Sequence, residues 1–388
     1  MDTDPIKFGT DGWRAPLKEF TVPRVRAVGQ AVATYLTDTG DERPVAIGYD
    51  AREHSAEFAE ELADVLCANG FDVVLPERDR PTPVFAYGIV DRNLAGALVI
   101  TASHNPPEYN GVKVIPSDGA PALPSVTDAI ADRLVEPQSA PRDERGTIRT
   151  VDFVSPHAEH VLELVDGDLT ETDLTVAYDA MHGSGRDTTD VLLEQAGVAV
   201  DRLRCESDPT FGGAAPEPVP ENLESLIDHV QSHKADIGIA NDGDADRIAI
   251  VTPKRGYLDE NLFFAALYDY VLEQASGPVV RTVSTTHLLD RIADAHGETA
   301  YEVPVGFKWV AQGIAEHEAL VGGEESGGFT IDGHVREKDG VLMALVAAAM
   351  HAEEPLDDRV DRLLEMHGTI VQDKRSVACP DEQKEPVL

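Results

Sequence analysis

A serine, a histidine and a lysine lie close together where an apolar run of the sequence ends. Residues 99–114 read VITASHNPPEYNGVKV, so Ser103 and His104 follow a β-branched stretch and Lys113 comes ten residues after the serine. The apolar stretch predicts a buried strand, and its polar end predicts a loop at the carboxyl edge of a sheet, where ligands gather in α/β proteins. In such a loop Ser103 could carry a phosphoryl group, while His104 and Lys113 could move protons or hold the phosphate.

The rival interpretation is a hydrolase in which Ser103 is the nucleophile and His104 its base. Adjacent side chains of a strand-like segment point to opposite sides, so we expect these two to lie apart. The sequence also lacks the G-x-S-x-G motif in which α/β-hydrolases expose their serine. Both observations argue against hydrolysis of esters or peptides.

A second loop carries three alternating carboxylates. Residues 241–247 read NDGDADR and place Asp242, Asp244 and Asp246 directly after an apolar strand. Carboxylates this close repel one another, which favours a bound cation, and hard oxygen ligands suit Mg²⁺ or Ca²⁺. A helix–loop–helix calcium site would need a glycine close after the third aspartate, and neither Arg247 nor Ile248 is one, so Mg²⁺ is the better prediction. The alternative is an acidic turn without a metal.

A third loop, GGEESGGF at residues 322–329, combines glycines with a carboxylate and a hydroxyl. Glu324 and Ser326 are two residues apart, so in an extended loop both would point the same way. A carboxylate and a hydroxyl on one side suit the vicinal hydroxyl groups of a sugar. Taken alone the motif is weak, because glycine–glutamate loops are common in turns.

Five basic side chains adjoin glycines or other polar motifs: Arg14, Lys113, Arg247, Lys308 and Lys338. Any single one could be a solvated surface cation. The chain has only nine lysines, however, and three of them lie in these few segments. Together they predict a cationic pocket for a phosphorylated substrate, and with the serine and the aspartates they predict phosphoryl transfer.

Short apolar strands alternate with amphipathic helical stretches along the whole chain, which predicts α/β units with mixed, mostly parallel sheets. A chain of 388 residues is long enough for two to four domains. The segment at 136–150 is rich in charge, proline and glycine, and the strand–helix pattern restarts after it. We predict three tandem, related α/β domains, over residues 1–150, 151–254 and 255–366.

The composition excludes several classes of function. The chain has 71 acidic and 32 basic residues and a net charge of −39, which argues against nucleic acid and against anionic membranes. Acid spread along the whole chain, with arginine favoured over lysine, is typical of adaptation to high salt; an ordinary acidic enzyme is the alternative. Three scattered cysteines indicate a reducing compartment, and no apolar window could span a membrane, so we expect a cytoplasmic protein.

Eight motifs, in this order, resemble those of the α-D-phosphohexomutase family of phosphoglucomutases and phosphomannomutases: GTDGWR, PTP, TASHNPxxYNGxK, PEPVPENL, DGDADR, VGFK, GGEESGG and GHVREKDG. The resemblance covers residues 5 to about 385. It implies three related α/β domains and a fourth domain around a central cleft. It also implies an enzyme that interconverts hexose 1-phosphate and hexose 6-phosphate through a hexose 1,6-bisphosphate.

The resemblance assigns roles to residues of this chain. Ser103 would be a phosphoserine, and its phosphate would hold Mg²⁺ together with the three aspartates. Glu324 and Ser326 would bind sugar hydroxyls, with Lys308 and His334 as further substrate-binding residues. The side chains around the transferring phosphoryl group would be His104, Arg14, Lys113, Arg247 and Lys338.

Lys113 and Lys338 would be the general acid or base of this site. A lysine in that role must lose its proton near neutral pH. We therefore expect burial and neighbouring cations to lower the pKa of both lysines.

The chain departs from the family pattern at its end. The arginine–serine–glycine–threonine loop with which the fourth domain binds the distal phosphate does not occur, and residues 367–388 resemble only the opening of that domain. The alternative function is therefore a catalytically impaired or partner-dependent sugar-phosphate-binding subunit, with a second chain supplying the missing part. The sugar loop and Trp13 favour glucose, or mannose, over glucosamine. The oligomeric state stays open.

Overall fold

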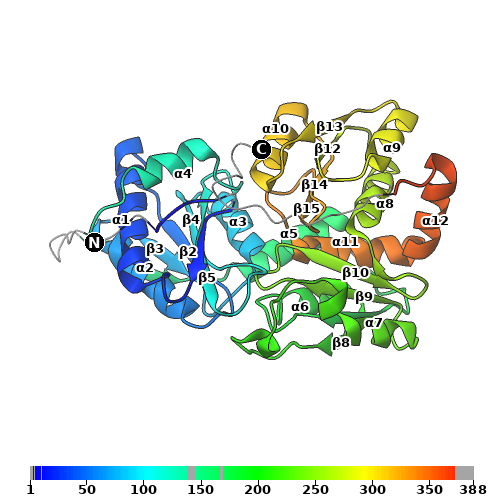
Figure 1. Cartoon of the computed structure of the whole chain (residues 1–388), viewed down its shortest axis with the longest axis horizontal. Coiled ribbons are helices and arrows are strands. Elements are labelled where there is room, and N and C mark those ends of the chain that lie inside the picture. Colours follow the sequence, from blue (N-terminus) through cyan, green and yellow to red (C-terminus); the bar gives the residue numbers. More distant parts are fainter. Residues whose placement is uncertain (1–2, 4, 10, 138–144, 167–168, 372–388) are drawn as a thin grey trace.

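The computed structural model describes the following residues of the chain: 3, 5–9, 11–137, 145–166 and 169–371. In them, three mixed β-sheets follow one another along the sequence, with helices packed on each (Figure 1). The predicted α/β class is confirmed. None of the described helices is long and apolar enough to cross a lipid bilayer. Most of the expected remnant of a fourth domain, residues 372–388, lies outside the described part of the chain.

The first sheet has six strands in the order β1-β5-β4-β2-β3-β6. Its strands β4, β2, β3 and β6 run parallel, whereas β5 runs antiparallel to both β4 and β1. The elements of this unit are β1 (Trp13–Pro16), α1 (Val22–Thr39), β2 (Val45–Tyr49), α2 (Ser55–Ala68), β3 (Val73–Leu75), α3 (Thr82–Asp91), β4 (Gly96–Ile100), β5 (Tyr109–Pro116), α4 (Pro124–Ala131) and β6 (Ile148–Thr150).

Strand β4, which leads to the serine loop, is apolar throughout because both of its faces are buried. Leu98 and Ile100 belong to the core that α1 and α2 form on one side of the sheet. Ala97 and Val99 belong to the core that α3 forms on the other side. Alternate residues of a strand point to opposite faces, so a sheet covered on both sides needs a continuous apolar run. This rigid central strand positions the loop that carries Ser103.

The second sheet has the order β11-β10-β9-β7-β8. Strands β9 and β10 form an antiparallel pair, so the aspartate loop is the turn between them and directly follows an apolar strand, as predicted. The elements of this unit are α5 (Val154–Val165), β7 (Thr175–Asp179), α6 (Thr189–Gln195), β8 (Ala199–Leu203), α7 (Glu224–Gln231), β9 (Ile237–Asn241), β10 (Ile248–Thr252) and β11 (Gly256–Leu258).

The third sheet has four strands in the order β13-β12-β14-β15, of which only the β14–β15 pair is antiparallel. The elements of this unit are α8 (Glu260–Leu272), β12 (Val279–Thr282), α9 (Leu288–His296), β13 (Ala300–Val303), α10 (Phe307–His317), β14 (Val321–Gly323), β15 (Phe329–Ile331), α11 (Gly340–Glu353) and α12 (Leu356–His367).

The second and third sheets share one hydrophobic core. Helix α11 is central to it, because every residue from 340 to 350 is buried and the helix packs against α5, α6 and β9 as well as β15. Burial on all sides explains why its sequence, GVLMALVAAAM, is apolar without a polar stripe. The loop that precedes α11, with Lys338, is therefore anchored to both sheets.

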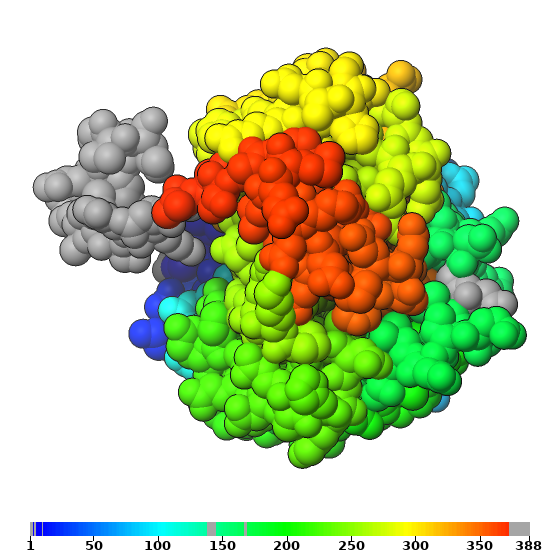
Figure 2. Space-filling view, turned by 90° about the vertical axis from the view of Figure 1, so that its right-hand side faces the viewer, coloured from blue at the N-terminus to red at the C-terminus, as the bar shows by residue number. Residues whose placement is uncertain are grey.

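Helix α12 also bridges these two units. Near its start, Asp357 accepts hydrogen bonds from Thr252 Oγ1 at 2.9 Å and from Arg255 Nη1 at 2.7 Å, at and just after the end of β10. Figure 2 shows this helix, in red, lying between the yellow segments of the third unit and the green segments of the second. The aspartate loop thus belongs to a unit that α11 and α12 hold firmly against the third unit.

A buried ionic contact joins the first unit to the second. Arg186, in the loop after β7, donates hydrogen bonds of 2.8 and 2.7 Å to the two carboxylate oxygens of Asp79, in the loop before α3. At the start of α3, Thr82 Oγ1 donates to Asp244 Oδ2 at 2.6 Å. These contacts fix the position of the serine-bearing unit relative to the aspartate loop.

We expect replacement of Arg186 by Met to lower the free energy of unfolding by about 3 kcal/mol, because it leaves the Asp79 carboxylate largely buried without its bidentate partner. The double variant Asp79→Asn/Arg186→Met should recover part of this loss, since no uncompensated charge remains. Urea unfolding of the purified variants measures both values. Arg43→Met, which breaks a more exposed pair with Asp41, is the control and should cost less than about 1 kcal/mol. Equal losses in the Arg186 and Arg43 variants would contradict this prediction.

Candidate active site

Ser103 lies in a tight turn after β4 and not on an extension of the strand. Its φ angle is +52°, in the left-handed region that non-glycine residues rarely adopt. Arg52 holds the turn by donating to the backbone carbonyl groups of Ser103 and Asn105 at 2.5 and 2.6 Å. The Ser103 side chain is buried, and Thr101 Oγ1 accepts a hydrogen bond from its backbone N–H at 2.8 Å.

The expectation that Ser103 and His104 point apart is wrong. Ser103 Oγ and His104 Nδ1 are 3.2 Å apart, because the turn replaces the alternation of a strand. Burial, reinforced by the nearby Arg247 and Arg14 cations, lowers the pKa of His104 to about 3, so the imidazole is neutral at neutral pH. The shorter contact of the hydroxyl is elsewhere: Ser103 Oγ donates to Asp242 Oδ2 at 2.7 Å.

The structure brings the serine loop of the first sheet onto the aspartate loop of the second. Asp242, Asp244 and Asp246 are fully buried, and one oxygen of each lies within 4.8 Å of the others. Gly243 allows this approach, because a Cβ atom there would lie 2.6 Å from the Ser103 carbonyl oxygen. A hydroxyl and three carboxylates from two units therefore converge on one point.

This group of oxygens fits a hard divalent cation. Asp244 Oδ1 and Asp246 Oδ1 are buried and accept no hydrogen bond from any described residue. Burial and then repulsion from Asp246 and Asp244 raise the pKa of Asp242 well above its usual value. Carboxylate oxygens that accept no hydrogen bond and repel one another are what Mg²⁺ would bind and neutralise.

Both predicted lysines reach the aspartates. Lys113 Nζ lies 2.5 Å from Asp246 Oδ2, 2.9 Å from Asp244 Oδ2 and 3.1 Å from Asp11 Oδ2. Lys338 Nζ lies 3.5 Å from Asp246 Oδ2 and 3.0 Å from its neighbour Glu337.

The expectation that the pKa of these lysines is lowered is wrong. Burial does act in that direction, but the surrounding carboxylates, Asp11 foremost, outweigh it and raise the pKa of Lys113 and of Lys338 above the usual value. Conversely, burial alone would raise the pKa of Asp244, but the Lys113 ammonium lowers it to about 2. Both lysines are therefore protonated at neutral pH and act as cations and hydrogen-bond donors.

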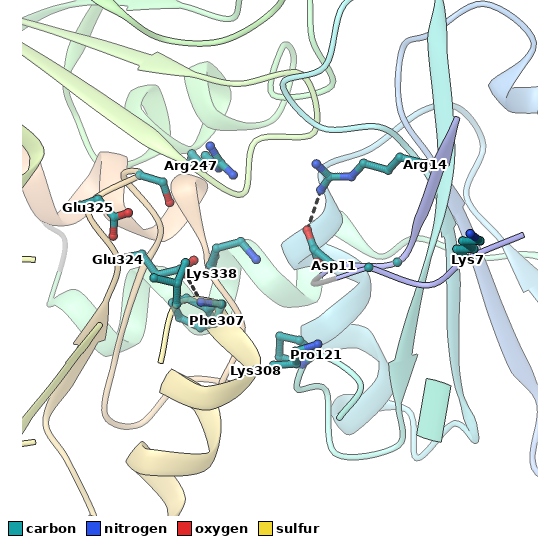
Figure 3. Close-up of a pocket in the computed structure, with 15 residues that line it drawn as sticks. Lys7, Asp11, Arg14, Pro121, Arg247, Phe307, Lys308, Glu324, Glu325 and Lys338 are labelled. Atoms are coloured by element: carbon teal, nitrogen blue, oxygen red, sulfur yellow. Dashed lines mark hydrogen bonds and ion pairs between the residues drawn. The ribbon is translucent and has the colours of Figure 1, made fainter. Parts of the chain in front are cut away.

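A cavity of about 450 Å³ opens beside this centre, between the first and third units. Arg14, Arg247, Lys308 and Lys338 line it, and Figure 3 shows Arg14 facing Arg247 and Lys338 across it. Arg14 also contacts the serine loop, because its Nη1 donates to Asn105 Oδ1 at 3.2 Å. The structure thus brings four of the five predicted basic residues to one cavity from segments far apart in the sequence. The fifth, Lys113, is not among the lining residues and contacts the aspartates instead.

The third loop is a tight hairpin turn and not the extended loop expected from the sequence. Gly322 and Gly323 belong to β14 and Phe329 to β15, and the Glu324 N–H donates to the Gly328 carbonyl at 3.0 Å. Glu324 and Ser326 nevertheless both line the cavity. Glu324 Oε1 also accepts from the Gly306 N–H at 2.9 Å, which ties this turn to the loop that carries Lys308.

His334 lies in a different place from the other candidates. It does not line the cavity that Arg247 and Glu324 border. Its ring is instead buried beside Asp339, with Nε2 at 2.9 Å from Asp339 Oδ2.

Sequence reasoning missed several polar residues of the site. Asp11 binds both Arg14 and Lys113, and Glu337 is buried with its pKa raised to about 7, mainly by burial. Both lie inside quoted motifs, with Lys338 directly after Glu337 and Arg14 three residues after Asp11, so a basic residue nearby in the motif was the available signal. Lys7 and Glu325 also line the cavity; Lys7 lies outside the quoted motifs, and Glu325 lies inside GGEESGG without a basic neighbour.

Three models of one protein family match the chain. All are described as phosphoglucomutase/phosphomannomutase, alpha/beta/alpha domain: domain I matches residues 5–140, domain II residues 155–256 and domain III residues 259–367. These matches cover most of the chain and follow the three sheets.

Individual relatives agree with the models. The phosphoglucomutase/phosphomannomutase of Thermococcus kodakarensis is 34% identical over 86% of this chain and 75% of its own length. A Methanothermobacter thermautotrophicus protein named as a probable phosphoglucosamine mutase is 33% identical over 99% of this chain and 83% of its own. The crystal structure of a putative phosphomannomutase from Thermus thermophilus, 29% identical, superposes with a TM-score of 0.88 over 95% of this chain and 85% of that one. By these matches and its own motifs, the chain is an enzyme of the phosphoglucomutase/phosphomannomutase family of α-D-phosphohexomutases.

Proposed function

We propose that this enzyme interconverts hexose 1-phosphate and hexose 6-phosphate, with glucose as the favoured sugar, through a phosphoserine at Ser103 and a hexose 1,6-bisphosphate. The observation that carries the proposal is the 2.7 Å contact between Ser103 Oγ and Asp242 Oδ2. It joins a hydroxyl of one unit to the buried carboxylates of another, beside a cavity lined with basic side chains. Such a site supports phosphoryl transfer by positioning and charge neutralisation.

The charged residues of the site would have different roles in phosphoryl transfer. When Mg²⁺ is bound to the three aspartates, it would supply positive charge to the phosphoryl oxygens. Arg14 and Arg247 extend planar guanidinium groups into the cavity and would bind the phosphoryl group from the other side. As the phosphoryl group leaves for a sugar oxygen, the bond between phosphorus and Ser103 Oγ breaks and the bond to the sugar forms.

In that step Ser103 Oγ must gain a proton and the sugar hydroxyl must lose one. One of the site's lysines would give its proton to the departing Ser103 Oγ and take up the proton of the sugar hydroxyl in exchange, so that the step balances. Lys113 and Lys338 are protonated at neutral pH, as their raised pKa values indicate, so each would serve first as an acid and as a donor to phosphoryl oxygens. His104 is neutral and adjoins Ser103. It would hold the serine oxygen in place between transfers.

Glu324 and Ser326 would bind the sugar hydroxyls, with Lys308 nearby for a phosphate. All three line the cavity, which is large enough for a hexose bisphosphate between two basic walls. The relatives carry names that refer to different sugars. Rates with glucose, mannose and glucosamine 1-phosphate, compared under one set of conditions, would order these substrates.

Replacing Ser103 by Ala should lower the conversion of glucose 1-phosphate to glucose 6-phosphate by on the order of 10³-fold or more, because no oxygen remains to carry the phosphoryl group. The assay needs Mg²⁺, a catalytic amount of glucose 1,6-bisphosphate and molar KCl. Intact mass of the native protein should show one extra phosphate, about 80 Da, that is absent from the variant.

The exposed Ser225→Ala on α7 is the control and should keep both activity and phosphate. Turnover that persists in Ser103→Ala would disprove the phosphoserine. A native protein that binds the sugar phosphate without converting it would support the alternative of a sugar-phosphate-binding subunit.

The aspartate loop predicts opposite effects of one substitution on stability and on activity. Asp242→Asn removes a buried charge that Asp244 and Asp246 repel. In the presence of EDTA it should therefore raise the unfolding temperature relative to the native protein, while activity with Mg²⁺ falls. Saturating Mg²⁺ should stabilise the native protein more than the variant. Calorimetry with and without Mg²⁺ measures this, and a variant that is less stable in EDTA would contradict the repulsion.

We also propose that the protein is adapted to high salt, on the basis of its net charge of −39. Raising KCl from 0.1 to 1 M shortens the Debye length from about 10 to about 3 Å and screens the repulsion among surface carboxylates. The unfolding temperature should rise over this range. Sucrose at equal osmolality is the control for effects of water activity alone, and a curve that is flat in KCl would refute the adaptation.

A further inference from the structure

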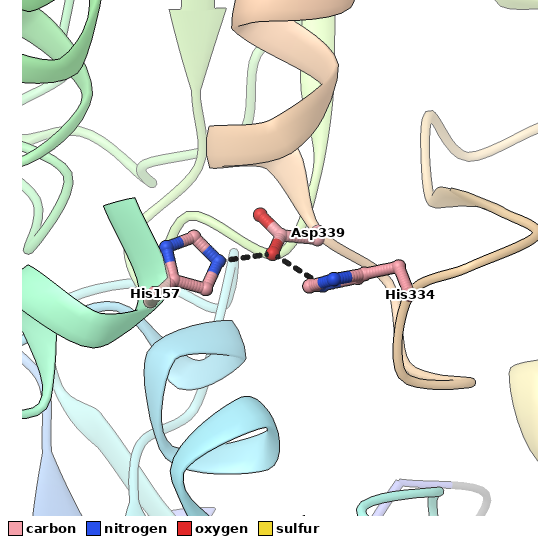
Figure 4. Close-up of side chains that lie close together, drawn as sticks. All are labelled: His157, His334 and Asp339. Carbon is pink, nitrogen blue, oxygen red and sulfur yellow. Dashed lines mark hydrogen bonds and ion pairs between the residues drawn. The ribbon is translucent and has the colours of Figure 1, made fainter. Parts of the chain in front are cut away.

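Two histidines and an aspartate converge on one point outside the catalytic cavity. His157 lies on α5, His334 in the segment between β15 and α11, and Asp339 at the first position before α11 (Figure 4). Asp339 Oδ2 lies 2.6 Å from His157 Nε2 and 2.9 Å from His334 Nε2. The three side chains are buried. Two imidazole nitrogens and one carboxylate oxygen thus face one another in a space closed to bulk water.

Further groups orient two of these three side chains from behind. The other oxygen of Asp339 accepts hydrogen bonds from the N–H groups of Val341 and Leu342, at 2.8 and 2.7 Å, and so caps α11. Behind His334, its Nδ1 is 3.1 Å from Nε2 of His160. Outer partners of this kind fix the ring and carboxylate orientations of metal ligands in proteins.

We propose that His157, His334 and Asp339 bind one divalent transition-metal ion of the zinc class. Imidazole nitrogen suits Zn²⁺ and its neighbours in the first transition row, whereas Mg²⁺ prefers oxygen throughout. Two histidines with one carboxylate form a common zinc ligand set, and a water molecule would complete the tetrahedron. The site is separate from the three aspartates of the catalytic centre, and the proposal does not depend on mutase activity.

Binding of the ion requires imidazole protons to move from one ring nitrogen to the other, but it requires none of them to leave the protein. In the metal-free protein each histidine can donate its Nε2–H to Asp339. To bind the ion, each ligating ring carries its proton on Nδ1 instead of Nε2. The Nδ1–H of His334 then donates to Nε2 of His160, and the proton that His160 carried on Nε2 moves to its own Nδ1. Ligand atoms about 2.0–2.1 Å from a tetrahedral ion lie about 3.3 Å apart, so the present contacts need to widen by less than about 1 Å.

A second cavity lies beside this cluster and would be the route by which an ion reaches it. It measures about 760 Å³, lies between α3 and the third unit, and has His160 and His334 in its wall. Asp118 in its wall is paired with Arg336, at 3.1 Å. Three further carboxylates line the same cavity and would attract a cation toward the histidines: Asp91, Glu318 and Asp332.

The bound ion would connect α5 to the start of α11. Lys338, which contacts the aspartate loop, is the residue directly before Asp339. A metal at this position would therefore hold one wall of the catalytic cavity in place. Its role would be structural, because no described residue of the catalytic cavity belongs to the cluster.

Metal analysis of the full chain tests the proposal. The protein is stripped with a chelator, dialysed against Zn²⁺ with excess Mg²⁺ to occupy the aspartate loop, and passed through a desalting column. We expect one zinc per chain, and at least a tenfold loss of retained zinc in the double variant His157→Gln/His334→Gln. His229→Gln is the matched control, because His229 forms a similar contact with Asp201, at 2.8 Å, near the surface; this variant should keep its zinc.

Two measurements keep the test decisive if the double variant folds poorly. Zinc-edge X-ray absorption of the native protein should show nitrogen and oxygen ligands at about 2.0–2.1 Å, with imidazole scattering and no sulfur. Asp242→Asn should retain the zinc, which separates this site from the catalytic centre. Loss of zinc in Asp242→Asn, absence of imidazole from the spectrum, or no zinc retained by the native protein would overturn the proposal.

Discussion

The repulsion among three buried carboxylates is the constraint on which this structure depends. Asp242, Asp244 and Asp246 occupy one turn and are fully buried. This arrangement lowers the stability of the fold unless nearby cations neutralise the carboxylates. The protein meets it in part with Lys113, brought from the first sheet, and Lys338, from the segment before α11. Two carboxylate oxygens still accept no hydrogen bond from any described residue, and they would suit a divalent ion.

The same constraint explains why the units must be held together. The aspartates and the lysines that neutralise them come from different units, so any movement between the units would separate the opposite charges. The buried Asp79–Arg186 pair fixes the first unit against the second, and α11 gives the second and third units a common core. The turn that carries Ser103 is strained, with φ at +52°, and such strain persists only where the surroundings over-determine the backbone.

The net charge of the chain and the charge of its cleft have opposite signs. Throughout a chain of charge −39, acidic side chains repel phosphorylated ligands from most of the surface. The cavity is different, because Arg14, Arg247 and Lys338 face one another across it (Figure 3). Under the proposed function, this contrast would direct a sugar phosphate toward the serine loop.

The sequence by itself determined the α/β class, the strands that precede the polar loops, and the serine, aspartate and basic residues of the site, because apolar runs and motifs are local. The tertiary structure alone decided how those residues interact. The turn that pairs Ser103 with His104, the raised pKa of Lys113 and the burial of His334 beside His157 depend on φ angles and on contacts between residues far apart in the chain. The periodicity of a sequence does not indicate which distant residues will come into contact. The pKa of a side chain cannot be predicted from it either, because that pKa is set by charges that folding brings from other parts of the chain.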